Sequence, residues 1–207
     1  MVRELSHPLA TSLVNRLRAT SCDASSFRRT VAELARMLSY EAFSDAPMAF
    51  KTVETWNGAE QYGFIDGAEY VMVPILRAGT PMLESLLELF PGAAAGFLAM
   101  KRDETTHKAV LYYDRVPECR GKRVVLLDPM VATGGSLCDA IAAIKEKGAA
   151  QIVSLNIIGS PEGVARVAAE HPDVALYIAK IDERLDADKF IHPGLGDAGD
   201  RAYNTPE

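Results

Sequence analysis

The residues best suited to chemistry lie in one stretch, residues 124–136, with the sequence VVLLDPMVATGGS. An aliphatic run ends in an acid, and two adjacent glycines follow between hydroxyl residues. Adjacent glycines let successive backbone N–H groups point into one concavity, and a following helix adds the positive end of its dipole. Leu137, Ile141 and Ile144 have the required helical spacing. The pattern predicts a strand, a loop and a helix that bind a phosphate monoester, whereas the absence of a P-loop lysine disfavours a nucleoside triphosphate.

Two arginines follow other β-rich runs. Arg77 comes directly after the aliphatic residues 73–76, and Arg102 lies in a mixed-charge stretch just after residues 96–100. In isolation, Arg77 is as typical of a surface turn as of a binding site, whereas the mixed charges around Arg102 favour a solvated loop. A guanidinium at a strand end can also bind pyrophosphate oxygens through its planar fork. Because both arginines follow predicted strands, we favour the second interpretation.

A third candidate is the run of residues 190–201, FIHPGLGDAGDR. It contains three glycines and one proline. Proline stiffens a chain where glycine permits tight turns, so the run predicts an ordered turn rather than a flexible tail. An ordinary C-terminal loop is the alternative interpretation.

From residue 70 onward, short β-rich runs alternate with helical runs, which is typical of a parallel sheet with helices on both faces. The expected strands are residues 70–76, 96–100, 123–127, 152–158 and 175–178. The expected helices are residues 81–89, 137–147 and 162–170, the second ending at Gly148. Ligands of such sheets lie beyond the carboxyl ends of the strands, where the acid and both arginines fall.

Residues 1–69 predict two helices and an extended arm. The first helix is indicated by apolar residues at every fourth position, Leu9, Leu13 and Leu17. Asp23 is a suitable N-cap for the second helix. The apolar face of that helix would consist of Phe27, Val31, Leu34, Ala35 and Leu38. A change of period near Trp56, with an Asn57-Gly58 turn, indicates a hairpin.

The composition is that of a globular protein of one domain, with 207 residues, 48% of them hydrophobic, and a formal net charge of −6. An acidic balance disfavours a nucleic-acid-binding protein that works by bulk charge. The three cysteines lack metal-ligand spacing, so we expect reduced thiols. We see neither a leader-like N-terminus nor an apolar stretch long enough to cross a bilayer, which predicts a cytoplasmic protein.

The strand, the acid and the Thr-Gly-Gly-Ser turn together resemble the 5-phosphoribosyl-1-pyrophosphate (PRPP) loop of type I phosphoribosyltransferases. Most members carry two adjacent acids there, whereas the Asp128-Pro129 pair is similar to the uracil-specific branch of the family. The resemblance covers nearly the whole chain, with further matching motifs at residues 7–9, 40–42, 73–79, 160–163 and 171–174. It implies an α/β fold with a central mostly parallel sheet and helices on both faces. The single domain would comprise N-terminal helices with a β-arm (1–69), an α/β core (70–180) and a uracil-binding segment (181–207).

The resemblance implies a PRPP site made of the loop and the arginines. The implied PRPP-binding residues are Arg77, Arg102, Asp128, Pro129, Met130, Val131, Ala132, Thr133, Gly134, Gly135, Ser136 and Asp197. Residues 133–136 would bind the 5-phosphate, and Asp128 would accept hydrogen bonds from the ribose hydroxyls. Met130 and Val131 suit packing better than chemistry. Because Pro129 cannot chelate a metal, the expected cofactor, Mg²⁺, would be held through PRPP and water, with no direct protein ligand.

By the same resemblance, the C-terminal run binds the base. The implied uracil-binding residues are Ile191, Gly196, Asp197 and Ala198. Backbone groups can match the two carbonyls and the N3–H of uracil, whereas the amine of cytosine would place donors against donors. His192 and Phe190 depart from the residues usual in the family, which leaves the fine base specificity open.

The implied reaction combines uracil and PRPP into uridine 5′-monophosphate and pyrophosphate, a step of pyrimidine salvage. Arg77, Arg102 and Asp197 would be catalytic. The arginines would stabilise the charge of the leaving pyrophosphate, and Asp197 is a candidate for assisting deprotonation of N1. Residues 103–118 would form a mobile flap that excludes water, with residues 110–113 as a candidate strand within it.

The expected partners are the substrates uracil and PRPP, without nucleic acid or a membrane. The N-terminal helices and the arm suggest a homo-oligomer, a dimer or a tetramer. Some members of the family are activated by GTP, which makes GTP a candidate effector. Two other functions stay open, phosphoribosyl transfer to another base, such as a purine, and an RNA-binding regulator built on the same fold.

Overall fold

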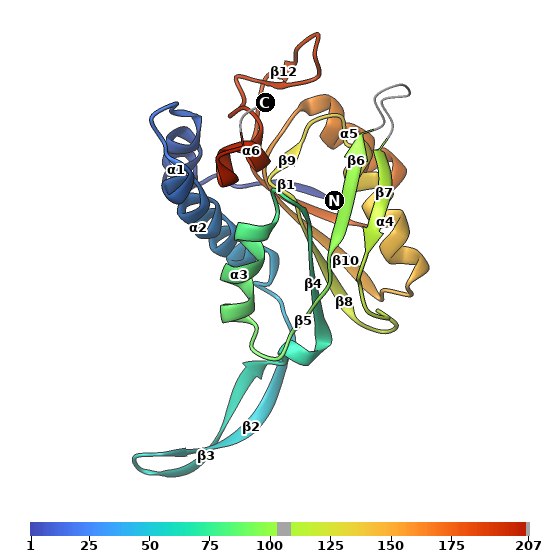
Figure 1. The fold of residues 1–207 in the computed structure, drawn as a ribbon. Helices are drawn as coiled ribbons and strands as arrows, with labels where there is room; N and C mark the ends of the chain where they lie inside the picture. The colour runs from blue at the N-terminus through green and yellow to red at the C-terminus, as the bar shows by residue number, and fades with distance from the viewer. Residues whose placement is uncertain (103–108, 206–207) are drawn as a thin grey trace.

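A twisted, mostly parallel sheet forms the centre of the computed structural model, which describes the chain except for residues 103–108 and 206–207 (Figure 1). The strand order is β1-β11-β10-β8-β4-β6-β7, with β5 beside β4 and β9 beside β10. Among these strands only β6 and β7 pair antiparallel. The strands are β1 (Val2–Glu4), β4 (Tyr70–Leu76), β5 (Ala94–Ala95), β6 (Leu98–Arg102), β7 (Ala109–Asp114), β8 (Arg123–Leu127), β9 (Met130–Val131), β10 (Gln151–Gly159) and β11 (Ala175–Ile181).

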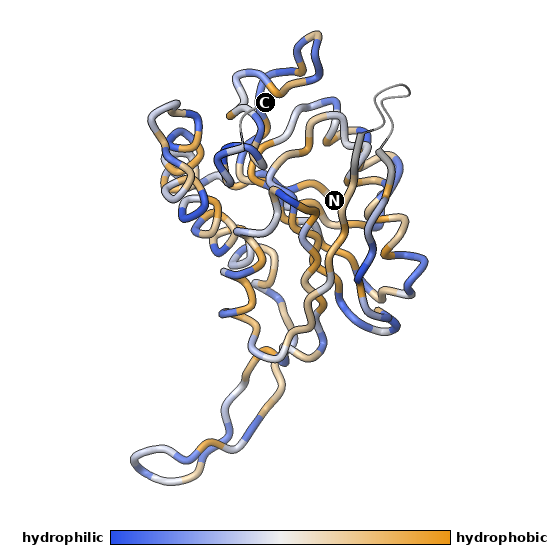
Figure 2. The backbone as a smooth tube through the Cα atoms, viewed as in Figure 1, coloured by the Kyte–Doolittle hydropathy of each residue, from blue (hydrophilic) through white to orange (hydrophobic). Residues whose placement is uncertain are grey.

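Helices cover both faces of the sheet, as the alternating pattern predicts. On one face lie α1 (Pro8–Arg18), α2 (Ala24–Ala42) and α3 (Thr80–Leu89), and on the other lie α4 (Gly135–Glu146) and α5 (Pro161–Glu170). The central strands are buried on both faces of the sheet, and their sequences are therefore nearly continuous aliphatic runs. In β4, Tyr70 and Met72 face one core while Val71 and Val73 face the other. Figure 2 shows the hydrophobic residues concentrated along these strands.

The second helix has the predicted cap and the predicted buried face. The side chain of Asp23 accepts a hydrogen bond from the backbone N–H of Ser26, which satisfies a free donor of the first turn. Phe27, Val31, Leu34, Ala35 and Leu38 are all buried. The C-terminal glycine of α4 is also confirmed, because Gly148 has a φ of +77°.

The first predicted helix is confirmed, but its buried face is not the row of leucines at every fourth position. Leu9 is 63% exposed, and the buried residues of α1 are Ala10, Val14 and Leu17. Residues four apart drift around a helix of 3.6 residues per turn by about 40° at each step, so Leu9 and Leu17 cannot share one narrow face. The buried set instead follows the i, i+4, i+7 spacing that returns to the same side.

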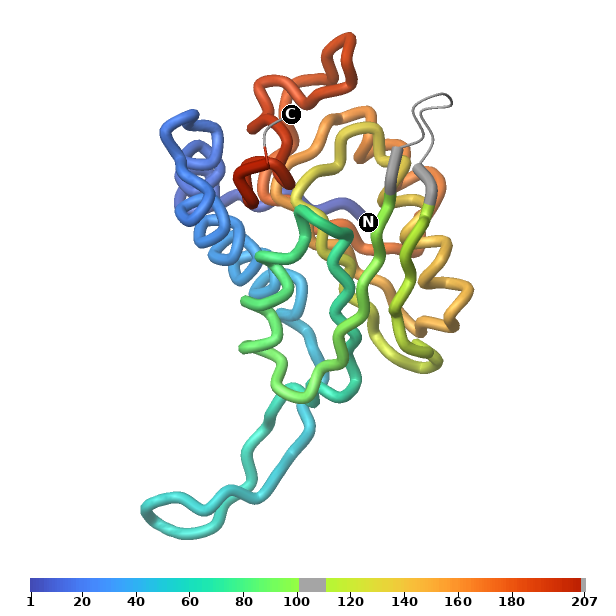
Figure 3. The backbone as a smooth tube through the Cα atoms, viewed as in Figure 1, coloured from blue at the N-terminus to red at the C-terminus, as the bar shows by residue number. Residues whose placement is uncertain are grey.

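The predicted hairpin is confirmed as an arm that projects away from the sheet (Figure 3). Strands β2 (Met48–Thr55) and β3 (Gly58–Ile65) pair antiparallel around a two-residue turn. Gly58 closes the turn with a φ of +123°, a conformation that side chains rarely adopt. The arm exposes Trp56 by 97%. A short 3-10 turn, η1 (Gly67–Glu69), leads from the arm into β4.

Several short elements were not anticipated. They are β1, β5, β9, the β12 (Arg184–Leu185) and β13 (Ile191–His192) pair, and the terminal helix α6 (Ala198–Tyr203). The predicted flap is only partly testable, because residues 103–108 lie outside the described residues. The candidate strand within it, residues 110–113, is confirmed, since residues 109–114 form β7 on the edge of the sheet. In the described part of the chain, no helix is both long and apolar enough to cross a membrane.

Candidate active site

The predicted phosphate loop forms a nest at the carboxyl edge of the sheet. Strand β8 ends just before Asp128, β9 follows, and α4 begins at Gly135. Gly134 precedes the helix with a φ of +75°. A cavity of about 210 Å³ opens over this loop. It is lined by Ile75, Leu76, Ala78, Met100, Asp128, Met130, Val131, Ala132, Thr133, Gly134, Gly135, Ser136 and Leu137.

The start of α5 fixes the shape of the nest. A Cβ atom on Gly163 would lie 2.1 Å from the carbonyl oxygen of Ala132, and one on Gly134 would lie 2.7 Å from the carbonyl oxygen of Gly163. Only glycine permits this approach of two backbones. Ser160 adds a hydrogen bond of 2.6 Å from its hydroxyl to Ala132, and the hydroxyl accepts from the N–H of Gly163. Sequence reasoning did not assign Ser160 and Gly163 to the site, although they fall in a matching motif.

Asp128 is almost fully buried beside the nest, with 9% of its surface exposed. Burial raises the pKa of its carboxyl group to about 7, opposed by a hydrogen bond from the backbone N–H of Met130. Its main chain is held by Asn156, whose amide donates to the Asp128 carbonyl at 2.6 Å. Ser154 in turn donates to the Asn156 side chain, and both residues are completely buried. The carboxyl group can therefore accept hydrogen bonds from ligand hydroxyls without being able to move far.

Arg77 lies one residue beyond β4, and its guanidinium group turns toward the C-terminal helix. It donates to Asp200 at 2.7 Å and to the hydroxyl of Thr205 at 2.9 Å. Its side chain is 55% exposed and is not part of the cavity lining. A Cβ atom on Gly79 would lie 2.2 Å from the carbonyl oxygen of Leu127, so the turn after Arg77 packs directly on β8. No local sequence pattern indicates Asp200 as the partner of Arg77.

Arg102 is the last residue of β6, which pairs with β4 through Ile75 and Leu76. The structure thus brings the chain at Arg102 to the same edge as Arg77, as predicted. The side chain of Arg102 lies outside the described residues, so its contact with PRPP stays a prediction. Met100, two residues earlier, lines the cavity.

The predicted base-binding residues differ from one another in exposure. Ile191 and Ala198 are buried in the core that α1 and α2 share, whereas Gly196 and Asp197 are exposed. Asp197 caps α6 by accepting from the N–H of Asp200 at 2.9 Å. None of these predicted uracil residues is among those lining the 210 Å³ cavity. Gly199 lies close to both the predicted base residue Asp197 and the predicted pyrophosphate residue Arg77. A Cβ atom on Gly199 would lie 3.2 Å from the Asp197 side chain and 3.5 Å from that of Arg77.

One cluster of side chains has the residue types of a metal site. Ligand atoms of Cys138, Glu170 and His171 lie within 4.8 Å of one another. Arg166 already donates to Glu170 at 2.7 Å, and the ammonium nitrogen of Lys145 lies 3.3 Å from Nδ1 of His171. Burial also raises the pKa of the Cys138 thiol to about 12. Two cations and a protonated thiol suit hydrogen bonding between helices better than a metal ion.

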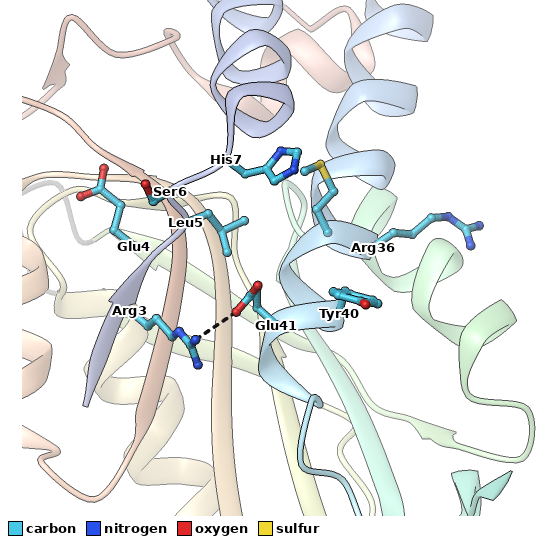
Figure 4. Close-up of a pocket in the computed structure, with 9 residues that line it drawn as sticks. Arg3, Glu4, Leu5, Ser6, His7, Arg36, Tyr40 and Glu41 are labelled. Carbon is cyan, nitrogen blue, oxygen red and sulfur yellow. Dashed lines mark ion pairs between the residues drawn. The ribbon is translucent and has the colours of Figure 1, made fainter. Parts of the chain in front are cut away.

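A larger cavity, of about 560 Å³, lies between β1 and α2 (Figure 4). Its charged residues are largely paired, Arg3 with Glu41 at 3.2 Å and Arg36 with Glu88. Tyr40 stands at its rim, 82% exposed. This cavity has no backbone nest or buried acid among its described lining, so the nest beside Asp128 is the candidate active site.

Comparison with known proteins matches nearly the whole chain to one family. The family model described as uracil phosphoribosyltransferase matches residues 4–205. The uracil phosphoribosyltransferase of Aquifex aeolicus is 43% identical over 203 residues, covering 98% of each chain, and that of Levilactobacillus brevis is 41% identical over 202 residues, covering 97% of each. A solved structure of an Aquifex aeolicus protein matches with a TM-score of 0.94, 43% identity and 98% coverage of both chains. The chain therefore belongs to the uracil phosphoribosyltransferase family.

Proposed function

We propose that this protein transfers the 5-phosphoribosyl group of PRPP to N1 of uracil, forming uridine 5′-monophosphate and pyrophosphate in pyrimidine salvage. The observation that carries the proposal is the backbone nest of residues 133–136 directly beside the buried Asp128. The nest offers N–H donors and a helix N-terminus to a phosphate, and the acid offers acceptors to the adjacent ribose hydroxyls. A sugar phosphate fits this pair of features better than an inorganic phosphate does.

In the proposed reaction, N1 of uracil attacks C1 of the ribose as the bond to pyrophosphate breaks. The transition state carries positive charge on the sugar and negative charge on the leaving group, so no protein nucleophile is needed. Residues 133–136 and Asp128 hold the ribose phosphate in place, and Arg77 and Arg102 stabilise the pyrophosphate. Positioning and charge stabilisation are the largest contributions available to such a transfer.

Mg²⁺ is the cofactor that we propose for the bound PRPP, where it would neutralise pyrophosphate charge. The donor set fits a substrate-held ion, because Asp128 is the one carboxylate among the described residues that line the cavity. Its neighbour Pro129 has no side-chain ligand atom. Octahedral Mg²⁺ retains several water ligands and binds readily through substrate oxygens.

We propose that the base binds to the segment around Asp197. Gly196, with a φ of +78°, leaves main-chain groups accessible next to that exposed acid. The proximity of Asp197 and Arg77 to the same glycine, Gly199, supports a base site next to the pyrophosphate site. Asp197 is also the proposed group that assists deprotonation of N1.

A homo-oligomer, a dimer or a tetramer, is part of the proposal. The β2–β3 arm exposes large apolar side chains on both of its faces and at its tip, which a monomer would leave in water. They are Met48, Phe50, Trp56, Tyr62 and Phe64. Light scattering of the wild type and of the Trp56→Ser, Phe50→Ser double variant tests this: the expected oligomer should dissociate in the variant, and a monomeric wild type would contradict the proposal.

The activity is tested by incubating the protein with PRPP, Mg²⁺ and one of uracil, cytosine, hypoxanthine or xanthine, and then measuring pyrophosphate release. Only uracil should give product. Product from hypoxanthine and none from uracil would overturn the proposal. Adding GTP to the uracil reaction tests the proposed effector, since an activator should raise the initial rate. We also propose that the protein is cytoplasmic, which cell fractionation can test.

A further inference from the structure

The end of α1 and the segment after β11 are joined by a nearly buried ion pair. The guanidinium group of Arg18 donates to both carboxylate oxygens of Asp182, at 2.8 and 2.5 Å. The side chain of Asp182 is 2% exposed and that of Arg18 is 21% exposed. A paired, two-pronged contact of this kind is geometrically specific. Neither residue belongs to the predicted substrate sites.

This ion pair holds both backbone polar groups of one residue, Gly194. Arg18 donates to the Gly194 carbonyl oxygen at 2.6 Å, and Asp182 accepts from the Gly194 N–H at 3.0 Å. Gly194 has a φ of +63°, and a Cβ atom on it would lie 2.0 Å from the carbonyl oxygen of Ile191. The turn that precedes Gly196 and Asp197 is therefore fixed by side chains from two distant elements.

Arg201, in helix α6, forms hydrogen bonds both with the end of α1 and with the turn that follows Gly194. It donates to Leu195 at 2.9 Å, to Ala19 at 2.7 Å and to the carbonyl oxygen of Leu17. Its guanidinium carbon lies 4.7 Å from the centre of the Phe27 ring. The last carbonyls of α1 have no partner within their helix, so Arg201 caps that helix while it holds the segment. In Figure 1 the C-terminal helix α6 and the helices α1 and α2 lie side by side.

We propose that Arg18 and Asp182 are positioning residues for the base. They hold the main chain of residues 194–198 in the conformation in which its N–H and C=O groups can form hydrogen bonds with the edge of the base. The proposal rests on the proposed function and deepens it, because it assigns base affinity to residues that do not touch the base. Main-chain recognition requires the N–H and C=O groups to be held in place, since a backbone shift of about 1 Å weakens hydrogen bonding steeply. The phosphate nest lies on other elements and does not depend on this ion pair.

The test is steady-state kinetics with Arg18→Lys and Asp182→Asn, with uracil and PRPP varied separately. Lysine keeps the charge at position 18 but cannot hold both carboxylate oxygens and a carbonyl in one plane. We expect the KM for uracil to rise about tenfold or more, the effect of losing one charge-assisted hydrogen bond. The KM for PRPP should stay within about twofold. The control is Lys180→Gln, which breaks the 2.9 Å ion pair with Glu4 of the neighbouring strand β1 and should change neither KM.

A purely structural role predicts a different result, in which the melting temperature falls and both KM values rise together or stay unchanged. Either pattern would overturn the proposal. Should Asp182→Asn fail to fold, the charge-conserving Arg18→Lys decides, because it leaves no buried charge without a partner. If the wild type rejects uracil but accepts another base, the proposed function fails, while the KM for that base still reports on the ion pair.

Discussion

Arg77 and Asp200 form an ion pair that joins the turn after β4 to helix α6, with 2.7 Å between Nη2 and Oδ1. Thr205 completes the group, because its hydroxyl accepts from Arg77 and donates to Asp200 at 2.8 Å. The hydrogen bond from Thr205, followed by that from Arg77, lowers the pKa of Asp200. A carboxylate thus lies against the guanidinium group that we propose for pyrophosphate, so the two anions compete for it.

The first prediction follows from that competition. Asp200→Asn should lower the KM for PRPP by about two- to fivefold, the size expected for an exposed ion pair. Steady-state kinetics with PRPP varied at saturating uracil gives the value. Asp173→Asn is the matched control, since it removes another exposed carboxylate 2.7 Å from a cation, Lys145, far from the nest. A higher KM in Asp200→Asn would mean that Asp200 itself helps to bind the substrate.

The second prediction concerns Arg102. Arg102→Ala should cost about 2–4 kcal/mol of transition-state stabilisation, if the arginine acts as charge builds on pyrophosphate. The ratio kcat/KM for PRPP should then fall by roughly 30- to 1,000-fold. Lys101→Ala removes the neighbouring cation, which belongs to none of the predicted sites, and should have little effect. Unchanged turnover in Arg102→Ala would remove this residue from the mechanism.

The third prediction tests the contact between α5 and the nest. Gly163→Ala should raise the KM for PRPP and destabilise the fold by roughly 1–3 kcal/mol, because its methyl group would overlap the Ala132 carbonyl. Urea unfolding and kinetics measure the two effects. Gly121→Ala is the control, since a Cβ atom there meets nothing within 4 Å although φ is +73°. The Gly121→Ala variant should lose stability without a change in the KM for PRPP. An unchanged KM for PRPP in Gly163→Ala would show that α5 does not shape the site.

The fourth prediction is the pH dependence caused by Asp128. Its pKa is raised by burial from 3.8 to about 7, so folding favours the protonated form. The stabilising contribution is therefore complete below about pH 4 and is lost as the pH rises through about 7. Asp128→Asn removes this contribution, so the wild type should lose stability relative to the variant between pH 4 and pH 8. Urea unfolding at several pH values measures the difference, and parallel curves would contradict the raised pKa.

The sequence predicted the parts of the fold whose residues are buried on both sides. The strands β4 and β8 begin and end at the predicted residues, because aliphatic runs at the centre of a parallel sheet have no other stable place. The edge strand β1 was missed, since its three residues are all exposed and carry no apolar pattern. Its place is determined by pairing with β11, a contact between residues far apart in the sequence, such as Val2 and Leu176.

The candidate site was predictable where local sequence determines the backbone. The Thr-Gly-Gly-Ser turn forms a nest through its own glycines, and Asp128 follows a buried strand. Hydrogen-bond partners from distant segments were not predictable, because no local sequence pattern indicates them. Examples are Asp200, the partner of Arg77, and Ser160, the partner of Ala132. The contributions of Ile191, Gly196, Asp197 and Ala198 to base binding stay predictions, as does the division into residues 1–69, 70–180 and 181–207.

The ion pair between Arg18 and Asp182 has a consequence for the order in which the protein folds. It joins residues 164 positions apart, whereas the contact of Ser160 with Ala132 closes a loop of only 28. Long loops cost more conformational entropy before their contacts form, and the C-terminal residues leave the ribosome last. The nest for the phosphate can therefore assemble before the segment for the base. A chain still in synthesis would therefore complete the proposed phosphate site first and the proposed base-binding segment last.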